Sequence, residues 1–262
     1  MALAVDAHGD VTVLDQVHRR AQRFQAGRLS AVIDLAGEGV QDVATLPGGG
    51  TAVLDRLGTQ TVALYDGGGR PLRTIPLTGG AIAEGGAVTG LFADTGGVYV
   101  EREHREVVRL ASADGEADGT RPTLWGRPSR DGRTLLRAGI QDGPHGAVYV
   151  SVADRSTGAM DWTRSLALDG AALQIVLLDG DHAGAVYLGA VVATMRGATP
   201  EDAHVTVVRL DTTGTPTGTL RLPAPPASDE VFRAYAVGDD GTVYAMVPGD
   251  DGLEVRAYRL GD

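Results

Sequence analysis

The chain contains no cysteine, no lysine and no asparagine among its 262 residues. Without cysteine it has no disulfide bonds, no thiolate zinc site and no iron–sulfur cluster, and its redox compartment is not indicated. Without lysine it forms neither a Schiff base nor a phosphate-binding loop of the Gly-Lys-Ser/Thr type. These absences exclude several classes of enzyme before any motif is considered.

A concentrated basic charge and long apolar runs are also missing. The formal net charge is −11, and all 23 basic residues are arginines scattered among 34 carboxylates, so we expect no nucleic-acid partner. Apolar stretches such as 171–178 fall short of the roughly 20 residues that a transmembrane helix needs. Residues 1–6 lack the charge and apolar pattern of a secretory signal. We therefore expect no direct membrane insertion of this segment.

Short strands separated by turns are what the remaining composition favours. The chain has 38 glycines and 12 prolines, and only 5% of its residues are aromatic. Turns must be frequent, because glycine and proline supply the backbone conformations that turns need. The core must come from valine, leucine, alanine and isoleucine in many short segments, which argues against a bundle of long helices.

A valine-rich run that follows a glycine recurs six times along the chain. A second apolar run follows each of the six and ends near a further glycine turn. The second runs start 41 to 57 residues apart, close to the spacing of roughly 40–50 residues that is typical of propeller blades. The six first runs begin at Gly9, Gly50, Gly97, Gly132, Gly184 and Gly241.

The first repeat shows most clearly how four antiparallel strands fit into one unit. We predict strands at 3–5, 10–14, 20–24 and 29–35, with a turn at 6–9 in which Asp6 accepts backbone amides and Gly9 supplies a positive φ. Applied to the whole chain, this pattern predicts an all-β, six-bladed β-propeller in a single domain. The blades are expected near 3–40, 41–86, 87–122, 123–170, 171–225 and 226–262.

Two repeats depart from this pattern. Residues 118–125 must hold both the last strand of the third repeat and the first strand of the fourth, so we expect one of these strands to be short. The sixth repeat ends after its third strand, and we therefore predict a last blade without its outer strand. We expect a strand from upstream of residue 3 to complete that blade, because an open sheet edge favours association.

The segment 3–24 resembles one repeat of the NHL-repeat propellers. It departs from that family at His18 and Arg19, which stand where the family has Asn and His, so a role tied to those two positions does not carry over. The resemblance implies a propeller fold and little about function, because propellers support many unrelated activities. The residues that carry it are Asp6, Gly9, Val11, Val13, Asp15, Arg20, Gln22 and Phe24.

Metal binding has two sets of candidate residues. Four of the six histidines, His18, His104, His145 and His204, fall at the starts of third strands. Equivalent third-strand positions on adjacent blades lie more than about 10 Å apart, so we expect no shared metal site. Carboxylate clusters such as 179–182 and 239–240 do not match the twelve-residue calcium loop and are expected to be hairpin turns. We expect no cofactor, and calcium is the ion that is left open.

Loops on one face are the expected binding surface, because binding residues concentrate on loops held by a rigid scaffold. The charged run 101–106 and an insertion at 194–203 lie between second and third strands, on this face. The candidate binding residues are His18, Asp55, Glu101, His104, Arg105, His145, Met195, Arg196, Glu201 and His204.

The sequence favours a non-catalytic interaction module for a protein, peptide or glycan. No Gly-x-Ser-x-Gly elbow or other catalytic motif is present. The alternative is a metal-dependent hydrolase or lyase of the propeller lactonase type, whose ion would lie at the axial tunnel. The carboxylates at the starts of first strands that would serve it are Asp42, Glu84, Asp229 and Glu230. We expect a bacterial, extracytoplasmic protein in which this segment is a monomeric domain of a longer chain.

Overall fold

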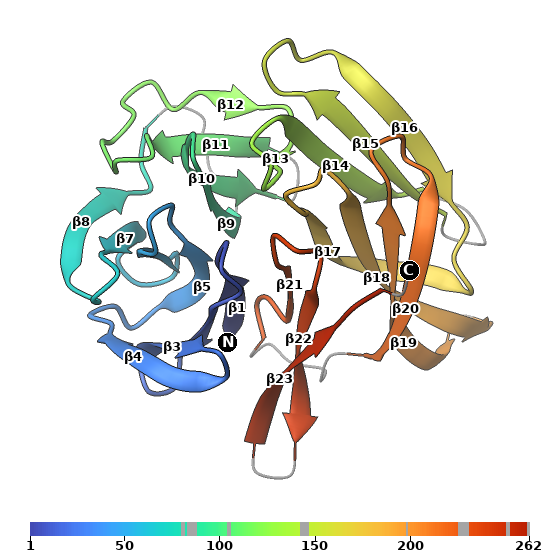
Figure 1. Cartoon of the computed structure of the whole chain (residues 1–262), viewed down its shortest axis with the longest axis horizontal. Helices are drawn as coiled ribbons and strands as arrows, with labels where there is room; N and C mark the ends of the chain where they lie inside the picture. Colours follow the sequence, from blue (N-terminus) through green and yellow to red (C-terminus); the bar gives the residue numbers. More distant parts are fainter. Residues whose placement is uncertain are drawn as a thin grey trace. The chain divides into compact units, whose positions relative to one another are not determined.

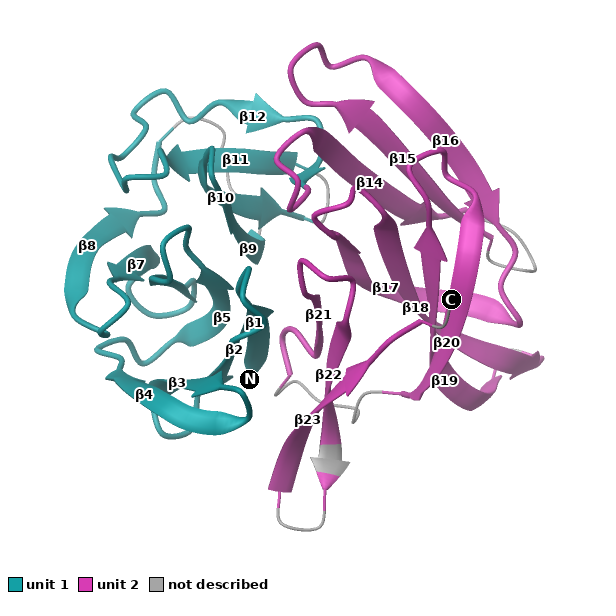
Figure 2. Cartoon of the chain, viewed as in Figure 1, with its two compact units in different colours: residues 1–128 teal, residues 129–262 magenta. Residues whose placement is uncertain are grey.

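The structure is a computed structural model of the whole chain, and it describes residues 1–79, 82, 88–103, 106–141, 147–197, 199–224, 231–249 and 252–260. Its named elements are all strands, and they form six antiparallel sheets (Figure 1). The fold is therefore all-β and of the six-bladed β-propeller class, as the sequence predicts. The chain divides into two compact units, Met1–Pro128 and Ser129–Asp262 (Figure 2).

The first three sheets have four strands each, and each strand pairs with the next one along the chain. The first sheet contains β1 (Ala2–Val5), β2 (Val11–Asp15), β3 (Arg20–Gln25) and β4 (Arg28–Asp34). The second contains β5 (Val40–Thr45), β6 (Thr51–Asp55), β7 (Thr61–Tyr65) and β8 (Pro71–Pro76). The third contains β9 (Val88–Asp94), β10 (Gly97–Arg102), β11 (Glu106–Ala111) and β12 (Thr123–Leu124).

The fourth and fifth sheets also have four strands, and the sixth has three among the described residues. The fourth contains β13 (Arg127–Pro128), β14 (Thr134–Ile140), β15 (Val148–Asp154) and β16 (Met160–Leu166). The fifth contains β17 (Ala171–Gly180), β18 (Val186–Arg196), β19 (Thr199–Leu210) and β20 (Pro216–Pro223). The sixth contains β21 (Tyr235–Val237), β22 (Val243–Gly249) and β23 (Gly252–Tyr258).

The predicted strands of the first repeat are confirmed, and the sixth sheet lacks a fourth strand within the described part of the chain. Two details differ from expectation. Both β12 and β13 are two residues long, so the third-to-fourth connection shortens two strands and not one. The segment 194–203 is not a loop, because β18 and β19 continue through it and pair at Thr194↔Glu201, Met195↔Pro200 and Arg196↔Thr199.

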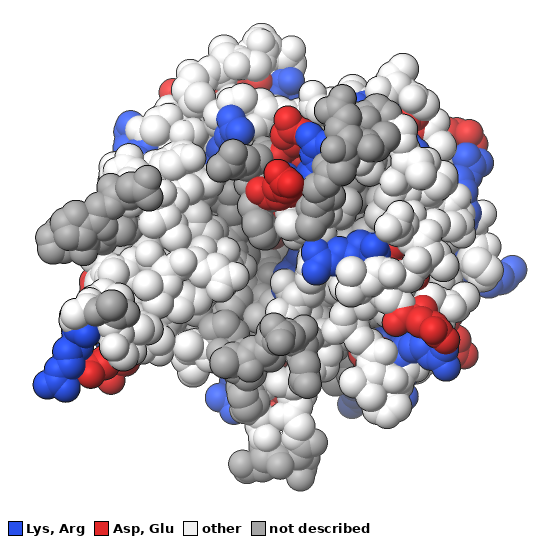
Figure 3. All heavy atoms as spheres, turned by 180° about the vertical axis from the view of Figure 1, so that it is seen from behind, with Lys and Arg blue, Asp and Glu red and all other residues white. Residues whose placement is uncertain are grey.

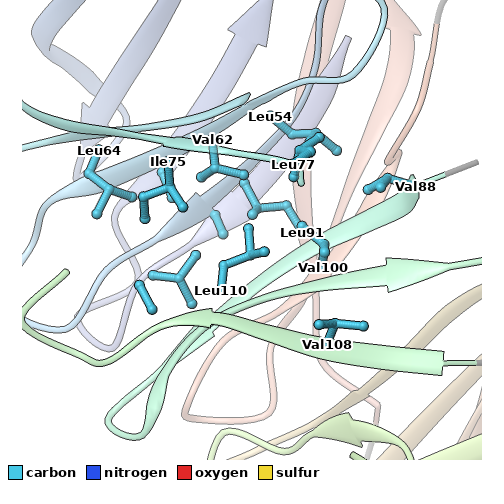
Figure 4. Close-up of a cluster of buried hydrophobic side chains, with 14 of the residues drawn as sticks. Leu54, Val62, Leu64, Ile75, Leu77, Val88, Leu91, Val100, Val108 and Leu110 are labelled. Carbon is cyan, nitrogen blue, oxygen red and sulfur yellow. The ribbon is translucent and has the colours of Figure 1, made fainter. Parts of the chain in front are cut away.

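The core lies between neighbouring sheets. Inner strands are buried on both faces: all four residues of β1 and all five of β6 are buried. Between the second and third sheets, Leu54, Ile75 and Leu91 lie in one cluster of aliphatic side chains (Figure 4). Burial of a leucine or isoleucine side chain contributes about 2 kcal/mol, so such clusters hold adjacent sheets together. Among the described residues, no helix is long and apolar enough to cross a membrane.

Candidate functional site

The turn between β2 and β3 is closed by a carboxylate at the end of a strand. Asp15 Oδ1 accepts the His18 backbone N–H at 3.1 Å, and Asp15 Oδ2 lies 2.8 Å from His18 Nδ1 and 3.0 Å from Arg20 Nε. Burial alone would raise the pKa of Asp15, but the hydrogen bonds from His18 and Arg20 outweigh it and lower that pKa. The turn is therefore fixed by its own side chains, and Val17 at its tip is left out of the network.

The turn between β6 and β7 is built in the same way. Asp55 accepts the backbone N–H groups of Gly58 at 2.7 Å and Thr59 at 3.1 Å, together with the Thr59 hydroxyl at 3.0 Å. The residue two positions after this aspartate is Leu57, which corresponds to Val17 after Asp15. Both turns thus hold an aliphatic residue at the same place.

A connector, residues 35–39, lies against both turns. The Leu35 backbone N–H donates to the Arg19 carbonyl at 2.9 Å, and Gln16 Nε2 donates to the carbonyl of the next residue after the connector, Val40, at 2.7 Å. On the other side, a Cβ added to Gly39 would lie 2.4 Å from the Gly58 backbone nitrogen. Only glycine permits this approach. The two turns are therefore neighbours across one connector, and we call residues 16–19, 35–39 and 56–60 the turn face.

The turn face exposes two aliphatic side chains beside charged ones. Val17 is 82% exposed and Leu57 is 72% exposed, the two highest values among the large hydrophobic residues described. Arg19 and Glu38 lie on the same face and approach each other at 3.6 Å with both side chains largely in water. An exposed ion pair of this kind adds little stability. An apolar patch with a polar rim is instead a common feature of protein-binding surfaces.

Glu101 lies on β10 and is buried. Its carboxylate forms a two-pronged ion pair with Arg127, at 2.7 Å to Nε and 2.9 Å to Nη2. The Arg127 guanidinium in turn lies over the Phe92 ring, 5.2 Å from its centroid. Glu101 and Asp55, both expected on a binding surface, thus direct their carboxylates into contacts within the fold.

His204 lies on β19, buried near Asp169. His204 Nε2 is 3.1 Å from Asp169 Oδ2, and Thr206 Oγ1 donates to Asp169 Oδ1 at 3.0 Å. His204 Nδ1 lies 3.1 Å from Arg221 Nη2 and 3.1 Å from the Asp202 carbonyl oxygen, so both ring nitrogens contact polar groups of the fold. Burial would raise the pKa of Asp169, but the hydrogen bonds from Thr206 and His204 outweigh it and lower it.

Met195, Arg196 and Glu201 lie at the exposed end of the β18–β19 hairpin. Arg196 and Glu201 approach at 3.5 Å, and Met195 is exposed. They share one hairpin, away in sequence from His18 and Asp55 of the first unit. His104, Arg105 and His145 lie outside the described residues.

Of the four carboxylates considered for a metal site, Asp42 is the one that the structure describes. It is fully buried on β5, where Oδ1 accepts the Val43 N–H at 2.9 Å and Oδ2 accepts the Leu91 N–H of β9 at 2.8 Å. Glu84, Asp229 and Glu230 lie outside the described residues. Within the described ranges, no three His, Asp or Glu side chains gather closely enough to hold a metal ion.

Sequence reasoning missed Val17 and Leu57. The candidates predicted from the sequence are charged residues, histidines and Met195, and no valine or leucine is among them. The available signal was an aliphatic residue placed two positions after a strand-ending aspartate, in Asp15-Gln16-Val17 and in Asp55-Arg56-Leu57. Its exposure depends on how the connector packs, which a strand pattern alone does not specify.

Charge on the molecular surface is mixed. On the face shown in Figure 3, the described arginine and acidic side chains lie in small groups of both signs between uncharged surface. Several are paired, as Arg73 is with Glu116 at 2.6 Å. The described charges on this face therefore form no extended patch of positive sign.

Comparison with known proteins identifies a class of fold. No protein-family model matches the chain, and no curated protein sequence matches it either. The NHL-repeat resemblance therefore stays a prediction. Solved structures do match: hydrazine synthase from Kuenenia stuttgartiensis has a TM-score of 0.60 at 13% identity, covering 97% of this chain and 75% of that one.

Two further structures extend the comparison. A chain of the mitotic checkpoint complex has a TM-score of 0.58 at 16% identity, covering 100% of this chain and 90% of that one. A gluconolactonase from Xanthomonas campestris has a TM-score of 0.53 at 15% identity, covering 98% of this chain and 85% of that one. At these identities the likeness establishes the propeller fold alone. The similar structures include both an enzyme and a component of a protein assembly.

Proposed function

We propose that this protein is a non-catalytic interaction module that binds a partner protein through the turn face of its first unit. The observation that carries the proposal is the pair of exposed aliphatic side chains, Val17 and Leu57, on two matching turns across one connector. Exposed apolar groups of this kind lower the free energy of a complex when a partner removes them from water.

The hydrogen bonds of the carboxylates in this region indicate that the carboxylates stabilise the turns, which leaves the turn tips to bind a partner. Asp15 and Asp55 each accept amides of their own turn, which holds the backbone that carries Val17 and Leu57 in one conformation. A preformed surface binds with a smaller loss of conformational entropy than a flexible one. The two carboxylates thus stiffen the turns, and the two aliphatic side chains remain exposed for contact with a partner.

The proposal is tested by a double variant, Val17→Asp with Leu57→Asp, against a control, Leu72→Asp. Leu72 lies on β8 and is 63% exposed, so the control makes the same chemical change outside the turn face. Immobilised protein is used to capture partners from an extract of the source organism, and each is quantified by mass spectrometry. The leading partner is then purified and titrated.

We expect the double variant to weaken that complex by about 30-fold, because a loss of about 1 kcal/mol at each of the two residues adds to about 2 kcal/mol. The Leu72→Asp control should bind as the unaltered protein does. Equal binding by all three proteins would overturn the proposal, and thermal unfolding of each protein checks that the variants are folded.

The alternative, a metal-dependent hydrolase or lyase, makes a different prediction. Metal analysis of the purified protein would then find a stoichiometric divalent ion. The position of Asp42 favours the interaction module, because the side chain is fully buried and each of its two carboxylate oxygens already accepts a backbone N–H.

A further inference from the structure

A histidine in the fifth sheet has two neighbours that make opposite demands on one ring nitrogen. His204 Nδ1 lies 3.1 Å from Arg221 Nη2, which can only donate a hydrogen bond. The same nitrogen lies 3.1 Å from the carbonyl oxygen of Asp202, which can only accept one. Whether Nδ1 carries a proton therefore decides which of the two groups it bonds to.

The other ring nitrogen determines the arrangement of the neutral ring. His204 Nε2 lies 3.3 and 3.1 Å from the two carboxylate oxygens of Asp169, which belongs to the loop between β16 and β17. The pKa of Asp169 is lowered from its ordinary value of 3.8, so this carboxylate is ionised near neutral pH and only accepts hydrogen bonds. Nε2 must then carry the single hydrogen of the neutral ring. Nδ1 is left as an acceptor, and its donor is Arg221.

A second proton on the ring reverses the hydrogen bond at Nδ1. Protonated histidine donates from both nitrogens, so Nδ1 donates to the Asp202 carbonyl while Nε2 keeps its bond to Asp169. The Arg221 guanidinium then faces a like charge at 3.1 Å, and the two charges repel each other. Arg221 is exposed, so its side chain can turn into water. Histidine is the side chain whose charge ordinarily changes between pH 5 and pH 8.

The groups that face His204 come from four parts of the fifth sheet and its connections. The loop before β17 supplies Asp169, β20 supplies Arg221, and β18 supplies the apolar Val192, which pairs with His204. On β19 itself, the acidic residues 201 and 202 come three and two positions before the histidine. Within the described part of the chain, the charged side chains that bond to the ring are one anion and one cation. Their opposing effects leave both charge states of the ring accessible.

Asp202 lies at the base of the exposed end of the β18–β19 hairpin, whose described residues are 194–197 and 199–201. Asp202 and Ala203 lie opposite the single residue Ala193, because the pairing register shifts there. Asp202 has a φ of 53°, a left-handed conformation that is uncommon for residues other than glycine. A bulge of this kind sets the direction of the strands beyond it. A hydrogen bond to the Asp202 carbonyl therefore holds the bulge and, through it, the hairpin end.

We propose that His204 is a pH-sensitive switch at the base of this hairpin. Uptake of a proton at Nδ1 moves its hydrogen bond from Arg221 on β20 to the Asp202 carbonyl on β19, and it releases the Arg221 guanidinium into water. The neutral ring thus holds β20, and the protonated ring holds the bulge. The hairpin end, which carries three of the predicted binding residues, is therefore more rigid in mild acid. This inference goes beyond the proposed function and does not depend on the turn face.

Nitrogen NMR of the histidine rings between pH 8 and pH 5 tests the switch, and a His204→Gln variant assigns the signal. We expect Nε2 to carry a hydrogen throughout and Nδ1 to gain one as the pH falls. The amide nitrogen of Ala203 is bonded to the Asp202 carbonyl carbon, so its signal should shift with the same midpoint as the ring. Relaxation of the backbone amides at 194–196 should show less motion at pH 5 than at pH 8.

Two variants should move the midpoint of this titration in opposite directions. Arg221→Ala removes the like charge that opposes protonation, so the midpoint should rise by about 0.5 pH unit, roughly a threefold change in proton affinity. Asp169→Asn removes the opposite charge that favours protonation, so the midpoint should fall by a similar amount. Arg256→Ala is the control, because Arg256 is exposed, bonds to Glu254 and has no described contact with His204. It should leave the midpoint unchanged.

Four results would each overturn the inference. One is a neutral ring that carries its hydrogen on Nδ1. Another is an Ala203 amide signal that does not follow the ring, which would show that the Asp202 carbonyl gains no hydrogen bond. The third is equal motion of the hairpin end at pH 5 and pH 8. The fourth is a midpoint that a folded Arg221→Ala variant leaves unchanged. The first three are measured on the unaltered protein, so they decide the matter even where a variant does not fold.

Discussion

Each unit contains an inner-strand aspartate that accepts a backbone N–H from the neighbouring sheet, and the two aspartates differ in how deeply they are buried. In the first unit, Asp42 of β5 accepts the N–H of the following residue and the N–H of Leu91 on β9, at 2.9 and 2.8 Å, and is 0% exposed. In the second unit, Asp179 of β17 accepts the N–H of Gly180 at 2.9 Å and the N–H of Val237 on β21 at 3.4 Å. Its side chain remains a quarter exposed and approaches Arg130 at 3.7 Å.

Both aspartates therefore fasten the first strand of one sheet to the first strand of the next. The difference between them shows that, in the same fold, such a carboxylate can be fully buried with a bond of 2.8 Å to the next sheet or a quarter exposed with a bond of 3.4 Å. The comparison also concerns function, because a metal-dependent hydrolase or lyase would bind its ion through inner-strand carboxylates. Their observed partners include backbone amides and an arginine.

The largest expected effect comes from removing the drier of the two aspartates. Asp42→Ala deprives two buried N–H groups of their acceptor, and each such loss costs about 1–3 kcal/mol. We expect the free energy of unfolding to fall by about 3 kcal/mol in a urea titration. Asp179→Ala is the matched variant and should lower it by about 1 kcal/mol, because water reaches that site. Equal losses would show that burial does not distinguish the two positions.

Two arginine–carboxylate ion pairs, one in each unit, also differ in burial. Arg127 forms a two-pronged ion pair with Glu101, whose side chain is 5% exposed, whereas Arg130 in the second unit bonds at 3.0 Å to Asp239, whose side chain is 25% exposed. Arg127→Ala leaves a buried carboxylate without its counter-charge, and we expect a loss of about 2 kcal/mol, less than the roughly 3–5 kcal/mol of a fully buried pair because the Arg127 side chain is 21% exposed. Arg130→Ala should cost about 1 kcal/mol, since water replaces part of the interaction.

The double-mutant cycle of Arg127→Ala with Glu101→Ala is the control for this prediction. Contacts that act as a unit are not additive, so the double variant should lose much less than the sum of the two single losses. Additive losses would mean that the two side chains stabilise the fold independently of each other.

The fold could be predicted from the sequence because the signals for turns and strands are local. Gly9, Gly184 and Gly241 fall after aspartate-rich turns, and each has a positive φ between 78° and 85°. The alternation of residues then defines the strands. Among the described residues, the sixth sheet has the three strands that this pattern predicts.

The candidate site was much harder to predict, since exposure and pairing depend on contacts between segments distant in sequence. Glu101 occurs in a charged run, yet Arg127 and the surrounding strands bury it. The segment 194–203 contains glycine, proline and charged residues that are typical of a loop, yet its backbone continues the β18–β19 ladder. Tertiary pairing overrides local propensity in both places.

The smallest expected effect is on stability in acid, and it again compares one carboxylate from each unit. Asp15 and Asp169 each accept hydrogen bonds from a histidine, and each has a pKa lowered from the ordinary value of 3.8. A folded-state pKa below the unfolded one stabilises the fold at any pH above the unfolded value, and this stabilisation disappears as the pH falls through the folded value. Asp15→Asn and Asp169→Asn should therefore lower stability near neutral pH and have no effect at strongly acidic pH.

The two variants should differ in size and in their response to salt. The Asp15 side chain is 16% exposed and that of Asp169 is 51% exposed, so solvent screens the second pair more strongly. We expect both losses to stay below about 1 kcal/mol, with the Asp169→Asn loss the smaller and the one reduced further by salt. Thermal unfolding between pH 7 and pH 2 at two ionic strengths measures both. A loss that persists at the acidic end would mean that these carboxylates act through packing, because their charge is then already gone.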